Sequence, residues 1–163
     1  MRWDTKKITT LAITVTLAMV LSFIESQIPP FVAIPGVKVG LANIAVIFAL
    51  YRFGWREAVI VSALRVLLVG LLFGSFVSTL YSIAGAVLSM TVMLTVRRIP
   101  SFSEVGVSVL GGVSHNVGQI VMASILLETD VVLYYLPVLL LSGTLAGIAV
   151  GAAGAVLLKK LKI

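Results

Sequence analysis

The chain is a succession of long apolar runs separated by short polar breaks. A bilayer core of about 30 Å requires roughly 20 apolar residues at a helical rise of about 1.5 Å per residue. The runs place six helices, the second of them short, at 8–28, 37–51, 55–73, 75–96, 105–127 and 131–158. The sequence therefore predicts an all-α integral membrane bundle of six transmembrane helices that forms one domain over 1–163.

Composition excludes most other classes of protein. Of the 163 residues, 60% are hydrophobic and 11% are charged, whereas a soluble domain carries about 25% charged residues. There is no cysteine, so disulfides and thiolate metal sites are excluded. The first apolar run continues to Ile28 without a small-residue cleavage site before it, so we expect a membrane helix there and not a signal peptide.

Basic residues divide unevenly between the polar breaks. With the N-terminus inside, the inner breaks hold 10 of the 12 Lys and Arg residues. The outer breaks hold Lys38 together with Glu25, Glu128 and Asp130. This is the pattern that the positive-inside rule describes, so both termini are expected in the cytoplasm. The formal charge of +6 is accordingly read as membrane topology and not as a nucleic-acid-binding surface.

The stretch "PGVKVGLANI" places polar groups where the second helix should enter the membrane. Pro29, Pro30 and Pro35 prevent a helix through the preceding loop. Lys38 can extend to the membrane surface, but Asn43 lies more than a turn deeper. One interpretation is a lid containing Pro35 and Gly36 over a cavity, with Lys38 and Asn43 at its edge; the other is a plain connector among the lipid headgroups.

Arg65 is a cation well inside the third predicted helix. It lies ten residues from the helix start, which corresponds to a depth of about 15 Å. A charge at that depth is unfavourable by several kcal/mol unless a partner or water meets it. The sequence shows no acidic residue at the same depth. Arg65 therefore either joins helices through backbone carbonyls or binds an anion in a hydrated cavity.

The fifth predicted helix adds polar residues at a comparable depth. Its segment "SVLGGVSHNVGQ" contains the only histidine, His115, together with Asn116 and Gln119. With Asn43 and Arg65 these residues form a polar layer that indicates either a binding site or hydrogen bonds between helices. A single histidine without nearby carboxylates is weak evidence for a metal, so no metal site and no cofactor are expected.

Small residues recur every fourth position on the first and last helices. Thr10, Thr14, Ala18, Ser22 and Ser26 form one ladder, and Gly143, Gly147, Gly151 and Ala155 form the other. Such ladders let helix backbones approach closely. Internal packing is one use, and docking of an external subunit is the other.

Catalytic motifs are absent from the sequence. Its two aspartates, Asp4 and Asp130, fall on opposite sides of the predicted membrane, so no carboxylate pair is available for a magnesium diphosphate. There is no phosphate-binding loop and no nucleophile elbow. We expect a protein that is not an enzyme.

The motifs "PGVKVGLANI" and "GGVSHNVGQ" resemble the small bacterial membrane proteins called Gx transporters, often named heptaprenyl diphosphate synthase component I. That family is similar in turn to the S components of energy-coupling-factor transporters. The resemblance implies a bundle that binds a vitamin-like nutrient in its outer half, beneath a closing first loop. It also implies a location in the bacterial cytoplasmic membrane.

The resemblance further implies partner subunits. S components obtain energy from a membrane coupling subunit with two ATPases, which they meet through small residues on the first helix. By position, Thr10, Thr14, Ala18 and Ser22 are the corresponding docking residues here. Lys38, Asn43, Arg65, His115, Asn116 and Gln119 are the corresponding solute-binding residues.

The expected function is thus the binding of a small, anionic, amphipathic solute from outside the cell. A second hypothesis is a non-catalytic accessory subunit of polyprenyl diphosphate or quinone synthesis. A third is a membrane scaffold without a ligand.

Overall fold

The computed structural model describes residues 4–27 and 40–160 of the chain. Helices make up most of this part, and it contains no strand. The elements follow in the order α1 (Thr5–Gln27), α2 (Asn43–Arg52), α3 (Trp55–Phe73), α4 (Phe76–Val96), α5 (Glu104–Leu127), the 3-10 helix η1 (Val131–Tyr135) and α6 (Leu136–Lys160). The prediction of an all-α fold is confirmed for the described residues.

The second helix begins later than the sequence suggested. The prediction was 37–51, but residues 40–42 form a turn and α2 starts at Asn43. Gly40 has a φ of 75°, a left-handed conformation that glycine adopts without strain. Its carbonyl accepts a hydrogen bond from the Asn43 backbone N–H at 2.8 Å, which closes the turn. Residues 37–39 of the predicted helix lie outside the described part.

The last predicted helix, 131–158, is two elements. The 3-10 helix Val131–Tyr135 precedes α6, which begins at Leu136. Pro137 then falls in the first turn of α6, where its missing N–H has no partner to lose. The predicted break between the helices 55–73 and 75–96 is present, because α3 ends at Phe73 and α4 begins at Phe76.

Four membrane spans are supported by length and composition within the described residues: α1, α4, α5, and η1 together with α6. The helix α2 has only 10 residues, or about 15 Å. The helix α3 has 19 residues but carries three charges, Arg56, Glu57 and Arg65. Six α-helices are therefore present in the described chain, and the chain is a membrane protein, whereas six spans remain a prediction.

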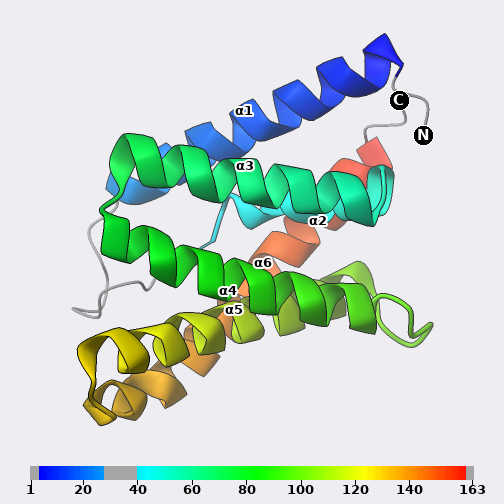
Figure 1. Cartoon of the computed structure of the whole chain (residues 1–163). Helices are drawn as coiled ribbons and strands as arrows, with labels where there is room; N and C mark the ends of the chain where they lie inside the picture. Colours follow the sequence, from blue (N-terminus) through cyan, green and yellow to red (C-terminus); the bar gives the residue numbers. More distant parts are fainter. Residues whose placement is uncertain (1–3, 28–39, 161–163) are drawn as a thin grey trace.

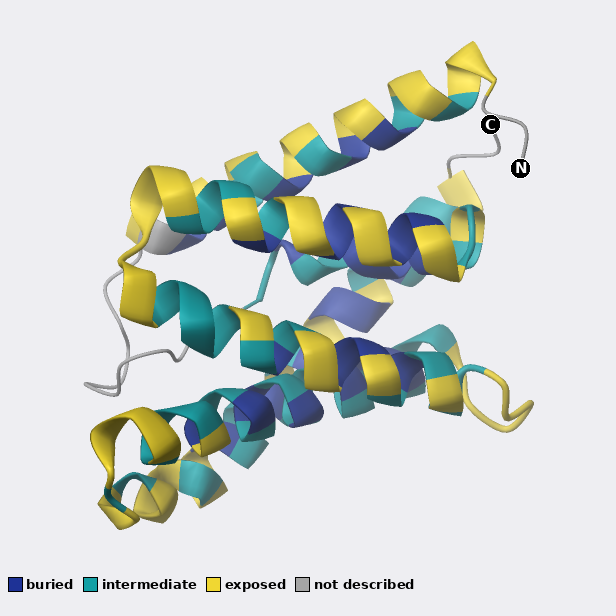
Figure 2. Cartoon of the chain, viewed as in Figure 1, coloured by how far each residue is buried: buried dark blue, intermediate teal, exposed yellow. Residues whose placement is uncertain are grey.

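The helices are arranged as a ring. The helix α5 packs most extensively against α6 and α4, α3 packs against α1, α2 and α4, and α6 returns to α2 (Figure 1). Buried residues lie on the inward faces and exposed ones on the outside (Figure 2). This arrangement surrounds a central space with residues from every α-helix.

Glycines set the close approach of α5 to α6. A Cβ atom on Gly147 would lie 2.5 Å from the Cα of Val109, and one on Gly112 would lie 2.6 Å from the carbonyl oxygen of Gly143. Real Cβ atoms do not approach backbone this closely, so the contacts require glycine. The ladder Gly143–Gly147–Gly151 is thus used for packing within the chain.

The ladder on α1 also faces inward. Thr14, Ala18 and Ser22 are buried in the bundle, and Ala18 has no exposed surface. Internal packing is thus one use of this ladder; Thr10 is half-buried, and docking of a partner through the four residues stays a prediction. Near the start of α1, Lys7 forms an ion pair with Glu57 of α3, with 2.5 Å between Nζ and Oε1.

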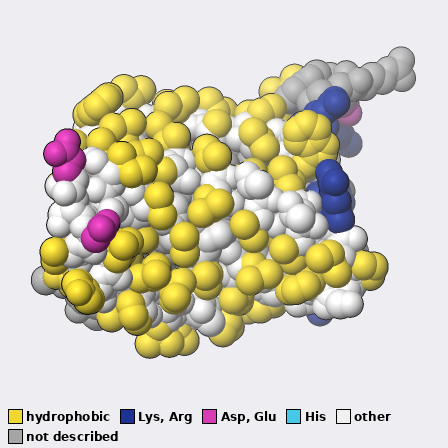
Figure 3. Space-filling view, turned by 60° about the horizontal axis from the view of Figure 1, so that its bottom comes forward, with side chains coloured by type: hydrophobic (Ala, Val, Ile, Leu, Met, Phe, Trp, Pro, Cys, Tyr) yellow, Lys and Arg dark blue, Asp and Glu magenta, His cyan; other side chains and the backbone are white. Residues whose placement is uncertain are grey.

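The outer surface is apolar around its middle and charged at its ends. Hydrophobic side chains cover the face in Figure 3, with Lys and Arg gathered at one end together with an acidic side chain, and with only acidic charged side chains visible at the other end. Large apolar residues such as Leu71 and Phe76 are 81% and 79% exposed. A soluble monomer rarely exposes so much continuous apolar surface. The start of α1, the end of α6 and the α2–α3 and α4–α5 connections lie together at the basic end (Figure 1).

We expect the basic end to face the cytoplasm, because positively charged segments are retained there. A single cysteine at Thr129, between α5 and η1, should react with a membrane-impermeant maleimide in intact cells. A cysteine at Ser101, in the α4–α5 connection, should react only after permeabilisation. The native chain has no cysteine to interfere. The reverse labelling pattern would contradict this orientation.

Adding one methyl group at Gly147 should destabilise the bundle. Gly147→Ala places a Cβ against the Val109 backbone, and overpacking of this kind typically lowers stability by about 1–3 kcal/mol. Ala152→Val, on an exposed position of the same helix, is the matched control and should leave stability nearly unchanged. Thermal unfolding of the purified proteins in detergent measures both, and equal effects would show that the α5–α6 contact is not tight.

Candidate functional site

A cavity of about 180 Å³ lies at the centre of the ring. Its lining comes from all six α-helices and from the α3–α4 turn at Gly74. Polar side chains are frequent in this lining: Ser22, Glu25, Asn43, Arg65, Ser75, Ser78, Thr79, Ser82, Ser89, Ser108, His115, Asn116 and Gln119. The lining runs from Glu25 and Gly74 at one end of the bundle to Met93 and Ser108, which lie near the α4–α5 connection at the basic end.

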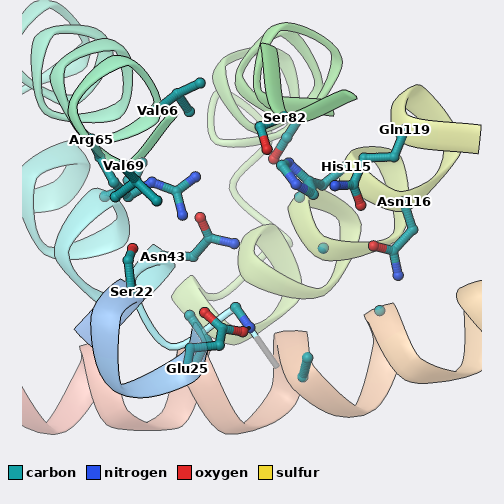
Figure 4. A pocket seen from close by; sticks show the side chains of 18 of the residues that line it. Ser22, Glu25, Asn43, Arg65, Val66, Val69, Ser82, His115, Asn116 and Gln119 are labelled. Atoms are coloured by element: carbon teal, nitrogen blue, oxygen red, sulfur yellow. Dashed lines mark hydrogen bonds between the residues drawn. The ribbon is translucent and has the colours of Figure 1, made fainter. Parts of the chain in front are cut away.

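Arg65 lines this cavity from α3, and its guanidinium points inward in the direction of Asn43 (Figure 4). Its Nε atom is buried and has no hydrogen-bond partner among the described residues. A buried donor on a charged group without a partner is unfavourable by about 1–3 kcal/mol or more. The direction of the guanidinium supports the interpretation of Arg65 as a cation that faces a polar cavity, while its Nε lies buried behind the surface of that cavity.

Glu25 is the acidic residue that the sequence analysis did not place near Arg65. It was assigned to the outer loop, but it lies in the last turns of α1, is 7% exposed and lines the same cavity. Its negative charge interacts electrostatically with the positive charge of Arg65. Its carboxylate accepts a hydrogen bond from the backbone N–H of Gly40. The cavity therefore holds charges of both signs, and an incoming anion would compete with Glu25 for Arg65.

His115 and Gln119 enter the cavity from α5, opposite Arg65 (Figure 4). They lie against Gly85 of α4, where a Cβ atom would fall 2.9 Å from His115 Cε1 and 2.9 Å from Gln119 Cγ. Gly85 thus provides the space for both side chains. The predicted polar layer of Asn43, Arg65, His115, Asn116 and Gln119 is brought together around one cavity.

Asn116 differs from the others because its amide has structural partners. Its Nδ2 donates to the carbonyl oxygen of Leu139 at 2.6 Å and to Ser142 Oγ at 3.3 Å. Both partners are on α6, and Asn116 is buried. This amide joins α5 to α6, which is the interhelical role that the sequence analysis had kept open for the polar layer.

The hydroxyl groups of α4 were missed by the sequence analysis. Ser78, Ser82 and Ser89 follow one another at spacings of four and seven, which places them on one helix face towards the cavity. The Ser82 hydroxyl donates to the Ser78 carbonyl at 2.9 Å, so its oxygen remains available as an acceptor. The spacing of these serines could have indicated a polar face on this helix. However, serine hydroxyls also bond to the backbone of their own helix where they have no role in binding.

Three predicted site residues, Pro35, Gly36 and Lys38, lie outside the described residues, so the predicted lid is not placed. The described part of the chain contains no group of three or more His, Asp or Glu side chains that could hold a metal ion. The donors that line the cavity include nitrogen groups on Arg65, Asn43, His115 and Gln119. Such donors are suited to oxygen atoms of phosphate or carboxylate groups.

Comparison of the sequence with known protein families gives one match. The sequence profile described as heptaprenyl diphosphate synthase component I matches residues 14–157 of the chain. The chain belongs to this family. The match includes the cavity-lining segments of every helix. Neither a curated protein nor a solved structure matches the chain significantly.

Removal of the Glu25 charge should strengthen anion binding in this family member. Glu25→Gln keeps an oxygen that can accept from the Gly40 N–H but removes the charge that competes for Arg65. We expect the affinity for inorganic phosphate or pyrophosphate to rise roughly three- to tenfold, since the interaction is partly shielded from water. Calorimetric titration of the purified protein measures this, with Glu128→Gln at the exposed end of α5 as the control. Unchanged or weaker phosphate binding to the Glu25 variant would contradict a competition between Glu25 and the anion for Arg65.

Proposed function

We propose that this chain is a membrane solute-binding protein that takes up a small amphipathic molecule through its anionic group. The observation that carries this proposal is the polar cavity in an apolar bundle, into which the guanidinium of Arg65 points (Figure 4). The planar guanidinium of Arg65 would donate hydrogen bonds to the anion. Asn43, His115 and Gln119 would bind the remaining oxygen atoms of the anion.

The orientation of the cavity supports uptake from outside the cell. The cavity lining includes Gly74 in the α3–α4 turn, which lies at the end of the bundle away from the α4–α5 connection (Figure 1), and it continues to Met93 and Ser108 near that connection. If the basic end faces the cytoplasm, the Gly74 end of the cavity faces the exterior of a bacterial cell membrane. No phosphate-binding loop is present in the sequence, so transport would need partner subunits, such as a membrane coupling subunit with ATPases of the energy-coupling-factor type.

The second candidate is a non-catalytic component of heptaprenyl diphosphate synthesis, which the description of the family favours. A prenyl diphosphate is also an amphiphile with an anionic group that Arg65 could meet. The two aspartates, Asp4 and Asp130, lie at opposite ends of the bundle, so they cannot together bind a magnesium diphosphate. Catalysis would then belong to a separate subunit, and this chain would hold or deliver the lipid.

Thermal-shift screening of the purified protein tests these functions. The panel contains vitamins, vitamin precursors and prenyl diphosphates, each with and without magnesium. A ligand at 100 times its dissociation constant adds about 2.7 kcal/mol of stability. We expect stabilisation by at least one anionic compound and its loss in Arg65→Met, which removes the guanidinium but keeps a long side chain. Arg65→Lys should not restore it, because an ammonium lacks the planar donor geometry.

Each outcome of the screen separates the candidates. Stabilisation by a nutrient without magnesium supports solute uptake. Stabilisation by prenyl diphosphates alone supports the synthase component and rules out the nutrient. An unstabilised protein, or an Arg65→Met variant that binds normally while remaining folded, would contradict the binding function and favour a scaffold.

A further inference from the structure

A second hollow lies beside the central cavity, on the outside of the bundle between α3 and α4. Its volume is about 460 Å³, and its walls include Ala63 and Leu67 of α3 and Val87 and Met90 of α4. Leu67 and Val87 are 50% and 63% exposed, whereas Met90 is 8% exposed. The hollow is therefore a groove with an apolar rim on the lipid-facing surface and a buried floor.

The polar groups of this groove offer little to a polar ligand. Thr91 donates its hydroxyl to the carbonyl of Val87 at 2.8 Å, so its hydrogen is already used. The remaining lining, apart from Ser62, is aliphatic or methionine. An apolar occupant is therefore favoured over a hydrated one.

The groove adjoins the central cavity at one residue. Val66, which follows Arg65 in the chain, lines both spaces and is 7% exposed. Further along the two helices, α3 and α4 are in tight contact, because a Cβ atom on Gly70 would lie 2.5 Å from Thr79 Oγ1. The helices separate beyond this contact (Figure 1), and the groove lies in that part of their interface.

The two volumes indicate how one ligand could use both spaces. Small-molecule sites usually measure roughly 300–1,000 Å³, and the polar cavity of about 180 Å³ is smaller than this range. It is large enough for an anionic head group but not for a complete amphiphile. The adjoining groove of about 460 Å³ has the room for an apolar chain that the polar cavity lacks.

We propose that the α3–α4 groove binds the apolar chain of the same ligand whose anionic head meets Arg65. The ligand class is then a single-chain amphiphile with a phosphate, diphosphate or carboxylate head. This inference rests on the proposed anion site at Arg65 and adds a specific place for the chain. It assigns Val66 to the boundary between head and chain.

Photochemical labelling in phosphatidylcholine nanodiscs tests the assignment. The probe is dodecyl phosphate with a diazirine in its chain, and the control is dodecanol with the same diazirine. We expect dodecyl phosphate to label Ala63, Leu67 and Met90 several-fold more than the lipid-exposed Leu141 and Leu145 of α6. Dodecanol should show no such preference, since it lacks the group that Arg65 binds. In the Arg65→Met variant, dodecyl phosphate should label the groove residues no more strongly than dodecanol does.

A matched pair of variants tests the groove itself. Ala63 and Ala152 are both exposed alanines, one in the groove and one on α6. Ala63→Phe fills the groove and should weaken dodecyl phosphate binding while leaving butyl phosphate binding unchanged. Ala152→Phe should alter neither. The comparison is independent of folding defects, because butyl phosphate binding reports an intact Arg65 site.

Failure of this inference can be told apart from failure of the anion site. If butyl phosphate stabilises the protein but dodecyl phosphate does not label the groove, the anion site stands and the chain-binding groove is wrong. If both diazirine probes label the groove equally, the groove is ordinary lipid-facing surface. If neither phosphate stabilises the protein in an Arg65-dependent way, the inference is overturned together with the anion site.

Discussion

A guanidinium inside an apolar bundle must be met by polar groups, and this requirement organises the centre of the protein. Arg65 projects from α3 into a cavity to which every α-helix contributes. Glu25 at the end of α1 supplies an opposite charge, and α4 and α5 supply hydroxyl, amide and imidazole groups. The buried Nε still lacks a partner in the described chain. The fold thus compensates the charge in part, and the guanidinium still faces the cavity.

The polar centre depends on close packing elsewhere. Glycines bring α5 against α4 and α6, with Gly118 against the Ala84 backbone and Gly112 against that of Gly143. In lipid there is little hydrophobic drive for helices to associate, so tight backbone contact and interhelical hydrogen bonds take that role. Asn116 adds such a bond to α6. The closely packed helices α4, α5 and α6 then hold His115 and Gln119 opposite the half of the bundle that carries Arg65.

The two spaces suit different parts of a ligand for a physical reason. The central cavity is polar and lies inside the ring, whereas the α3–α4 groove is apolar and faces lipid. A charged head gains from the cavity because Arg65 and the amides replace its water, and an apolar chain needs no polar partner in the groove. This division fits both an amphipathic nutrient and a prenyl diphosphate, so the family description and the solute-binding proposal share one site chemistry.

The sequence by itself determined the class of protein, most helix bounds and the polar layer, because hydrophobic length and charge placement are local properties of the chain. The run 55–73 became α3 unchanged, and Asn43, Arg65, His115 and Gln119 were recognised as unusual for a membrane helix. Only the tertiary structure decided that Glu25 lies near Arg65, that the small residues of α1 face inward, that Asn116 bonds α6, and that Val66 borders an apolar groove. These facts depend on how each helix is rotated and which neighbour it meets. Residue spacing within one helix fixes a face, but the partner of that face is set by packing across the whole ring.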